Sequence, residues 1–225
     1  GFLYSYAPSV LVTLSGTITK TYDGTTAATL TSSNYSISNV VGNDVVTYTT
    51  VATYSNANVG SALTFSLNNG SLTAVSSSKT VYGYQYSVTN NLVGVINKAT
   101  LTVAANNQST TYGTALNLGT TNFTITSGAL ASGDAITSVT LQYNSSSTVP
   151  ATTNAGTYSI TASNASGSGN FNTSNYALSY SNGSLTVNPP PLGISVTGTY
   201  SGSTTITPNS YVFTGLMNKD NLIPT

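Results

Sequence analysis

The sequence contains no Arg, Glu, His, Cys or Trp, and its 225 residues include only 4 Lys and 4 Asp. Without His or Cys the chain cannot build a Ser-His-Asp or Cys-His nucleophile, a structural zinc or iron–sulfur site, or a disulfide. A formal net charge of zero without Arg argues against nucleic acid as a partner, because binding needs cations that neutralise phosphates. No apolar run reaches the roughly 18 residues of a membrane-spanning helix. These absences favour a binding or structural protein over an enzyme, and we predict no catalytic, cofactor-binding or metal-ligating residues.

What the chain does contain is typical of β-structure. Hydrophobic residues make up 39% of it, and 16 residues are Tyr. Apolar and polar residues alternate, as in Tyr158-Ser159-Ile160-Thr161-Ala162, which indicates strands with one buried and one solvated face and favours antiparallel sheets. Asn69-Gly70 and Asn182-Gly183 are typical of hairpin turns. We predict an all-β protein of tandem immunoglobulin-like β-sandwich repeats, with β-grasp-like modules as the alternative, which the lack of a helical pattern weakens.

An internal repeat is the strongest pattern in the sequence. A Thr-Tyr pair recurs with Tyr22, Tyr112 and Tyr200, at spacings of 90 and 88 residues. One Asp follows each Tyr after 20 to 22 residues, and these are Asp44, Asp134 and Asp220. A fixed frame of this kind predicts repeated structural units. We expect the three Tyr rings to occupy equivalent positions and to be at least partly buried.

The repeat frame predicts four segments. Residues 1–14 end a preceding repeat, 15–104 form a first full repeat, 105–188 form a second, and 189–225 hold a Pro linker and an incomplete third repeat. The chain starts at Gly1 without a signal peptide, so we expect a mature chain or a fragment. Early strands of the third repeat, around 194–196 and 211–213, need further chain to bury both faces. We expect either the continuing polypeptide or a neighbouring molecule to cover residues 192–225.

The first repeat resembles the YDG repeat of large bacterial surface and adhesin-like proteins, and the second is similar to the related MBG repeat of the YGX type. The residues that carry the resemblance are Lys20 to Ala27, Val40 to Val45 and Asn58 to Gly60 in the first, and Tyr112 to Thr114, Ser132 to Asp134, Ala155 to Tyr158, Asn175 to Tyr176 and Asn182 to Val187 in the second. The resemblance implies a structural segment of an extracellular bacterial fibre, stalk or adhesin, without catalytic residues. Its implied partners are neighbouring repeats of the same chain or, in a filament or by lateral association, other copies.

Several candidate sites have simpler explanations. Asp23, Asp44, Asp134 and Asp220 are typical of turns rather than of paired catalytic carboxylates. Ser76 to Lys79 satisfies a serine acyl-enzyme motif whose partner motifs are missing. Lys20 near Asp23 is the one candidate for an isopeptide cross-link, with a solvated Lys as the simpler explanation. Calcium binding would need more acidic oxygens than one Asp per repeat supplies. The alternative function is a glycan- or ice-binding face of exposed Thr, Asn and Tyr, such as Thr17/Thr19 and Thr124/Thr126.

Overall fold

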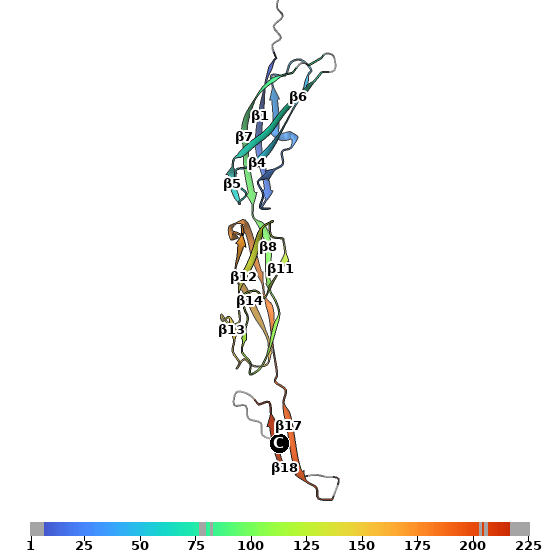
Figure 1. The fold of residues 1–225 in the computed structure, drawn as a ribbon, viewed down its shortest axis with the longest axis vertical. Helices are drawn as coiled ribbons and strands as arrows, with labels where there is room; N and C mark the ends of the chain where they lie inside the picture. The colour runs from blue at the N-terminus through green and yellow to red at the C-terminus, as the bar shows by residue number, and fades with distance from the viewer. Residues whose placement is uncertain (1–6, 77–79, 82, 203, 205–206, 217–225) are drawn as a thin grey trace, which may run out of the picture. The chain divides into compact units, whose positions relative to one another are not determined.

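The computed structural model describes residues 7–76, 80–81, 83–202, 204 and 207–216, and within these ranges the chain is all-β (Figure 1). Two short 3-10 turns, Ser32–Asn34 and Thr173–Asn175, are the helical elements of this part of the chain. The strands are β1 (Ser9–Thr21), β2 (Ala27–Ala28), β3 (Tyr35–Ser38), β4 (Val45–Tyr54), β5 (Gly60–Leu63), β6 (Phe65–Val75), β7 (Gln85–Asn97), β8 (Ala99–Ala105), β9 (Gln108–Thr111), β10 (Leu116–Asn117), β11 (Phe123–Ser127), β12 (Asp134–Gln142), β13 (Thr148–Val149), β14 (Gly156–Gly169), β15 (Tyr176–Ser181), β16 (Gly183–Asn188), β17 (Gly193–Thr199) and β18 (Thr207–Thr214).

The chain divides into two compact units. The first consists of Gly1–Thr100 together with two loop regions, Ala129–Ala135 and Gly169–Ala177. The second consists of Leu101–Gly128, Ile136–Ser168 and Leu178–Thr225. The boundary predicted between residues 14 and 15 falls inside β1, which is continuous from Ser9 to Thr21.

The first unit is built on two sheets, one ordered β3-β1-β7-β5 and the other β2-β4-β6. Val10, Val12 and Leu14 alternate along β1 and are at most 1% exposed, so the period of two places one face of this strand in the core. From the second sheet, Tyr54 contributes a buried ring that packs on Phe65 with centroids 4.7 Å apart. Its hydroxyl donates a hydrogen bond to the Ile18 carbonyl at 2.9 Å, which satisfies the polar end of the ring.

The second unit has two larger sheets, ordered β11-β8-β15 and β12-β14-β16-β9. Its core follows the predicted alternation, since Leu101 and Val103 on β8, Ile160 on β14 and Leu185 and Val187 on β16 are all 0–2% exposed. The exposed residues between them are Thr and Ser, as on β16, where Thr186 separates Leu185 from Val187. This pattern explains how a chain with so few charges keeps one solvated face on each strand.

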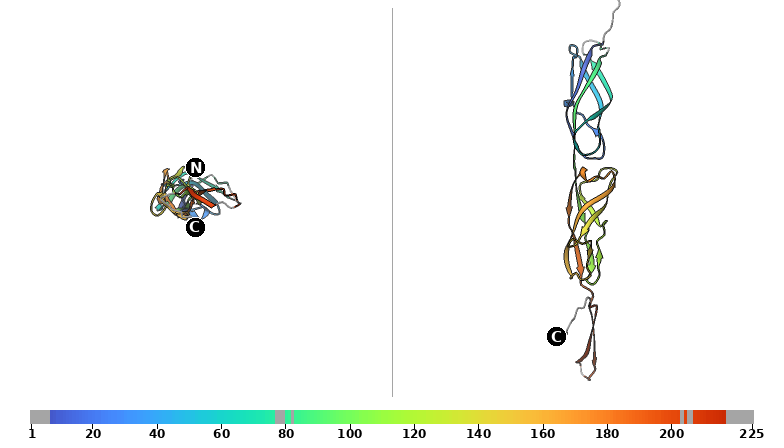
Figure 2. Two further views of the ribbon diagram at one scale, coloured as in Figure 1. Left: turned by 90° about the horizontal axis from the view of Figure 1, so that it is seen from below. Right: turned by 90° about the vertical axis from the view of Figure 1, so that its left-hand side faces the viewer.

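The expectation of antiparallel sheets is wrong for the first and last strands of both repeats. In the first unit β1 runs parallel to β7, in register from Ser9 opposite Gln85 to Thr21 opposite Asn97. In the second unit β16 runs parallel to β9, with Leu185 opposite Gln108. Figure 2 shows the long blue and green strands of the first unit side by side. Alternation alone cannot distinguish the two arrangements here, because a strand with one solvated face has the same period of two in either.

The two predicted hairpin turns are also wrong. Asn69 and Gly70 lie inside β6, where Asn69 has a φ of 53° and the pairing with β4 shifts register as in a β-bulge. A Cβ on Gly70 would collide with the Tyr48 hydroxyl, so the glycine leaves room for that side chain. Asn182 and Gly183 lie where the chain passes from β15 in one sheet to β16 in another.

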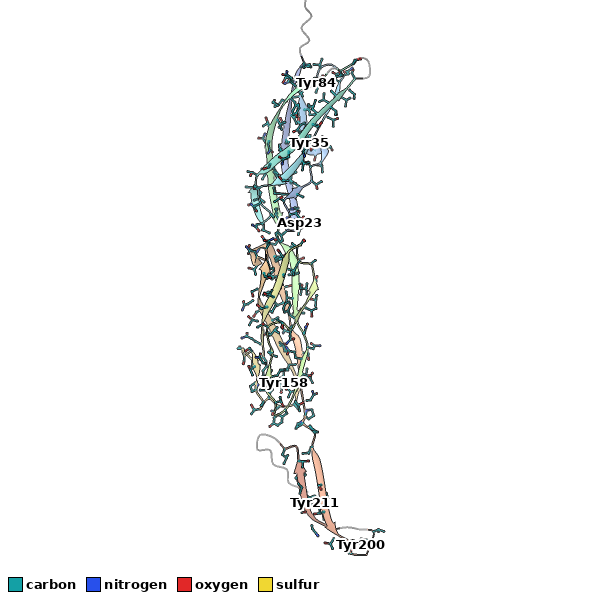
Figure 3. The ribbon with its side chains drawn as sticks, in the orientation of Figure 1. Asp23, Tyr35, Tyr84, Tyr158, Tyr200 and Tyr211 are labelled. Atoms are coloured by element: carbon teal, nitrogen blue, oxygen red, sulfur yellow. The ribbon has the colours of Figure 1, made fainter. Side chains whose placement is uncertain are left out.

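The strands β17 and β18, in the segment predicted to start a third repeat, form a two-stranded antiparallel ribbon that is grouped with the second unit. Its apolar side chains are exposed, with Ile194 at 60% and Val196 at 50%. Tyr22, Tyr112 and Tyr200 each directly follow a strand, namely β1, β9 and β17. The expected burial of their rings is correct for Tyr22 and for the half-buried Tyr112. It is wrong for Tyr200, which is 73% exposed (Figure 3), because among the described residues no second layer covers the ribbon.

Candidate functional site

A cluster of two tyrosines around Asp134 is the most elaborate polar arrangement in the first unit. One carboxylate oxygen, Oδ2, accepts hydrogen bonds from Tyr176 at 2.6 Å and from Tyr22 at 3.1 Å. The Ala131 amide donates to the Tyr176 hydroxyl at 2.9 Å, so this phenol both accepts and donates. Asp134 is positioned by a turn in which its own amide bonds to the Ala131 carbonyl at 3.0 Å. All four residues belong to the first compact unit.

The aromatic rings shield this cluster from water. The rings of Tyr22 and Tyr176 meet edge to face with centroids 5.4 Å apart, and Phe171 stacks on Tyr176 at the same distance. Tyr22 is 6% exposed and Tyr176 2% exposed. Burial raises the pKa of Tyr22, and the hydrogen bond to Asp134 adds to this effect. The same two causes, in the same order, raise the pKa of Tyr176 to about 12. Both phenols therefore stay protonated and act as donors.

We expect the Asp134 cluster to make the protein sensitive to alkaline pH. The pKa of Tyr176 is about 12 in the fold against 10.0 for an ordinary Tyr, so its contribution is complete below pH 10 and is lost as the pH rises through 12. In urea unfolding followed by Tyr fluorescence, the free energy of unfolding of Tyr176→Phe should fall less steeply across this window than that of the unaltered protein. Equal slopes for the two proteins would contradict the assignment.

An amide pair completes the cluster. Asn175, which precedes Tyr176, is 0% exposed. Its Oδ1 accepts a hydrogen bond from the Val59 amide at 3.0 Å, and its Nδ2 donates to Asn58 Oδ1 at 3.0 Å. The 3-10 turn Thr173–Asn175 presents this side chain, and Asn172 caps the turn by accepting from the Ser174 amide at 2.9 Å. The fully buried amide is thus satisfied at both its oxygen and its nitrogen.

Asp44 builds the same arrangement elsewhere in the first unit. Tyr84 donates to Asp44 Oδ2 at 2.7 Å, and the Val41 amide donates to the Tyr84 hydroxyl at 3.1 Å. The Asp44 amide bonds back to the Val41 carbonyl at 3.2 Å. The hydrogen bond to Asp44 raises the pKa of Tyr84, and burial adds to this effect. Both Asp residues therefore lie in turns, as the sequence predicts, and each turn also binds a tyrosine.

These tyrosine partners were not predicted from the sequence. Tyr84 lies 40 residues after Asp44, and Tyr176 lies 42 residues after Asp134. This second recurring spacing was available as a signal, but a Tyr-rich sequence gives no reason to prefer one Tyr over its neighbours. Asp220 lies outside the described residues, so its predicted equivalence stays a prediction.

Among the described residues, Lys20 has no partner suited to an isopeptide cross-link. Its Nζ donates to Asp23 Oδ1 at 2.7 Å and to the Thr25 carbonyl at 2.7 Å, and it lies 5.3 Å from the centre of the Tyr54 ring. Burial tends to raise the pKa of Asp23, but hydrogen bonds from Lys20 and Thr25 outweigh it and hold the pKa below its ordinary value. None of these contacts is to an Asn side chain. Through its hydrogen bonds to Asp23 and Thr25, Lys20 stabilises the turn that follows Tyr22.

The remaining candidates from the sequence are a metal site, the serine motif and the exposed Thr pairs. Among the described residues, no three His, Cys, Asp or Glu side chains gather as a metal site would require. The motif that ends at Lys79 falls largely on residues 77–79, which the structure does not describe. Thr17, Thr19, Thr124 and Thr126 are exposed on their strands, which is the ordinary position for Thr on a solvated face.

An aromatic cleft is a further candidate site. It has a volume of about 430 Å³ in the first unit and lies between β3 and β4. Tyr35 and Tyr48, with ring centroids 6.3 Å apart, contribute aromatic surface, and Tyr35 is labelled in Figure 3. The lining combines apolar and hydroxyl side chains and carries no charge; it consists of Ser32, Tyr35, Ile37, Val46, Thr47, Tyr48 and Thr49.

Comparison with known proteins identifies two domains. The searches of curated proteins and of solved structures found no match. In the part of the chain that the structure covers, no helix has the length and apolar character needed to cross a membrane. Residues 8–91 match the family model of the YDG domain, and residues 101–186 match that of the MBG domain of the YGX type. Domains of these two types are typical repeats of large bacterial surface proteins, and neither family is catalytic. The chain therefore contains a YDG domain, followed in tandem by an MBG domain of the YGX type.

Proposed function

We propose that the chain is a structural segment of an extracellular fibre, stalk or adhesin at a bacterial cell surface, where it spans distance and supports association with the surface or matrix. The observation that carries this proposal is the tandem match to two repeat families of surface proteins. The composition agrees with it, since the chain lacks the His, Cys, Glu and Arg side chains that most enzyme sites use. We also propose that each repeat is an immunoglobulin-like sandwich, in preference to a β-grasp-like module.

The proposed partners are neighbouring repeats of the same chain and, in a filament or by lateral association, other copies. The exposed apolar side chains of β17 and β18 support association with further chain, because such a ribbon gains stability when its faces and edges are covered. The near absence of charge also removes the long-range repulsion that keeps many proteins apart.

Immunogold electron microscopy of cells that make the protein tests this role. Antibodies against the purified chain should label intact, unpermeabilised cells at their outer surface, on filaments or on isolated stalks. Label that appears only after permeabilisation would refute the proposed location. Filaments that incorporate many gold particles would favour homotypic association, and single particles on stalks would favour a long individual chain.

The aromatic cleft favours a second candidate function, the binding of a neutral saccharide. Tyr35 and Tyr48 offer aromatic surface for the apolar face of a sugar ring, while Ser32, Thr47 and Thr49 offer hydroxyls at the cleft wall. A volume of about 430 Å³ lies within the ordinary range of small-molecule sites. An uncharged lining fits a neutral sugar better than an acidic one.

Titration with methyl glycosides and disaccharides, followed by amide chemical shifts in NMR spectra, tests this second function. We expect shifts confined to residues 32–37 and 46–49, and weaker binding by Thr47→Ala. The exposed Thr17→Ala on β1 is the matched control and should bind like the unaltered protein. Absence of any saturable shift with every sugar, or shifts spread evenly over the chain, would rule out a sugar site in the cleft.

A further inference from the structure

Two turns of the first unit form matching seats for a tyrosine hydroxyl. We define the Asp44 seat as Val41, Asp44 and Tyr84, and the Asp134 seat as Ala131, Asp134 and Tyr176. In both, the amide three residues before the Asp donates to the phenol, and the phenol donates to Asp Oδ2. In both, the Asp amide bonds to the carbonyl of that same residue. The three hydrogen bonds of one seat therefore correspond, atom for atom, to those of the other.

The Asp134 seat shows what such a seat binds. Tyr22, which directly follows β1, donates its hydroxyl to Asp134 Oδ2 at 3.1 Å. Gly24 lies so close that an added Cβ would be 3.2 Å from the Ala131 Cβ, and its φ is +77°. The incoming group is thus a Tyr followed within two residues by a left-handed Gly. The same pair recurs in the other repeats, with Gly113 at φ 93° after Tyr112 and Gly202 at φ 81° after Tyr200.

The two seats differ in how well they are covered. Tyr176 in the Asp134 seat is 2% exposed, whereas Tyr84 in the Asp44 seat is only partly buried and Val41 is 43% exposed. Figure 3 shows Tyr84 at one end of the first unit and Asp23, the neighbour of Tyr22, at the opposite end. The YDG domain therefore has Tyr22, the tyrosine that enters the Asp134 seat, at one end and its own Asp44 seat at the other end.

We propose that the Asp44 seat binds the tyrosine that ends the first long strand of another YDG or MBG repeat placed directly before β1. Its phenol donates to Asp44 Oδ2, and its Gly approaches Val41, as Tyr22 and Gly24 do at Asp134 and Ala131. The Tyr–Asp contact then defines a common junction by which successive repeats join. This inference goes beyond the proposed surface role and does not depend on where the protein is located.

The chain itself shows how such a junction is connected. The Tyr22 amide bonds to the Asn97 carbonyl at 2.8 Å, so Tyr22 sits beside the end of β7. Lys98 alone separates β7 from β8. β8 of the second repeat corresponds to the first part of β1 in the first repeat. β1 pairs antiparallel with β3, which comes after Tyr22, and β8 pairs antiparallel with β11, which comes after Tyr112. A chain that passes from Lys98 directly to Ser9 therefore reproduces the natural connection.

An extended protein tests the proposal, in which residues 1–98 are followed by residues 9–225. Tyr22 of the added copy should reach the Asp44 seat, while Tyr22 of the original copy keeps the Asp134 seat. With tyrosines labelled with ¹³C at Cζ, the added Tyr22 should titrate above the ordinary pKa of 10.0, as the original Tyr22 does. Asp44→Asn in the second copy should lower the pKa of the added Tyr22 and leave that of the original Tyr22 unchanged, and Asp134→Asn should do the reverse. Each substitution should also lower the pKa of the tyrosine already in its seat, Tyr84 or Tyr176.

Thermal unfolding gives a second test, because it measures the coupling between the added Tyr22 and Asp44 of the second copy. Tyr22→Phe in the added copy removes one hydroxyl and keeps the ring, so it leaves folding intact. Combined with Asp44→Asn in the second copy, it should lower the midpoint by less than the two single effects together, with a difference of about 2 °C. Strictly additive midpoints, or an added Tyr22 that titrates like a free phenol, would overturn the proposal. The matched pair Tyr22→Phe and Asp134→Asn calibrates the natural junction.

Discussion

Replacement of Leu185 by Ala is expected to lower the free energy of unfolding by about 2–5 kcal/mol. Leu185 is 0% exposed on β16, between Tyr158 on β14 and Gln108 on β9 in the sheet. Truncation removes buried methyl and methylene groups, and it leaves a cavity because the flanking strands are held by hydrogen bonds on both sides. The second unit should unfold first as a result.

Urea unfolding followed by Tyr fluorescence measures this effect, since the chain has 16 Tyr and no Trp. Leu192→Ala provides the matched control, because Leu192 is 49% exposed and also belongs to the second unit. Its substitution should change the free energy of unfolding by less than about 0.5 kcal/mol. Similar losses for the two variants would contradict the placement of the core.

The second large effect is expected at Asn175, where Ala should cost about 1–3 kcal/mol. The substitution leaves the Val59 amide and the Asn58 carboxamide without the partner that the buried side chain supplies. The cost arises from desolvated groups left unsatisfied, because the side chain itself is 0% exposed. Asn175→Asp retains the acceptor for Val59 and loses the donor to Asn58.

Hydrogen exchange at the Val59 amide and urea unfolding together test this expectation. The Val59 amide should exchange faster in Asn175→Ala than in the unaltered protein. The exposed Asn154→Ala serves as the control and should alter neither quantity. Val59 exchange that is unchanged in Asn175→Ala would show that the buried amide does not hold this segment.

The sequence predicted those features of the fold that are expressed locally along the chain. Alternation from Tyr158 to Ala162 correctly identified a one-sided strand on β14, and the TYDG and YGT motifs correctly identified the two domain types. The same alternation misled at the sheet level, because the parallel pairing of β1 with β7 joins residues 76 positions apart, such as Ser9 and Gln85. Direction of pairing depends on that long-range arrangement and not on period.

The candidate site was harder to predict for a related physical reason. Asp134, Tyr22 and Tyr176 are separated by 42 residues or more in the sequence, and turn chemistry alone explains an Asp after Gly. Asn175 is one of many Asn residues, and nothing local distinguishes a buried amide from a solvated one. In both cases the site depends on which strand ends, distant in the sequence, lie next to each other in the fold. The type of any one residue does not reveal this.

The parallel register of β1 and β7 has a mechanical consequence. These strands are the first and last long strands of the YDG domain, each of 13 residues and paired along its whole length. Tension applied at Ser9 and at Asn97 pulls the two strands in opposite directions along their axes. The ladder is then sheared, so its evenly spaced hydrogen bonds are strained together, whereas an antiparallel hairpin pulled at its open end unzips one bond at a time. The direction of a single strand pair thus makes the domain stiff along the line that joins its two ends.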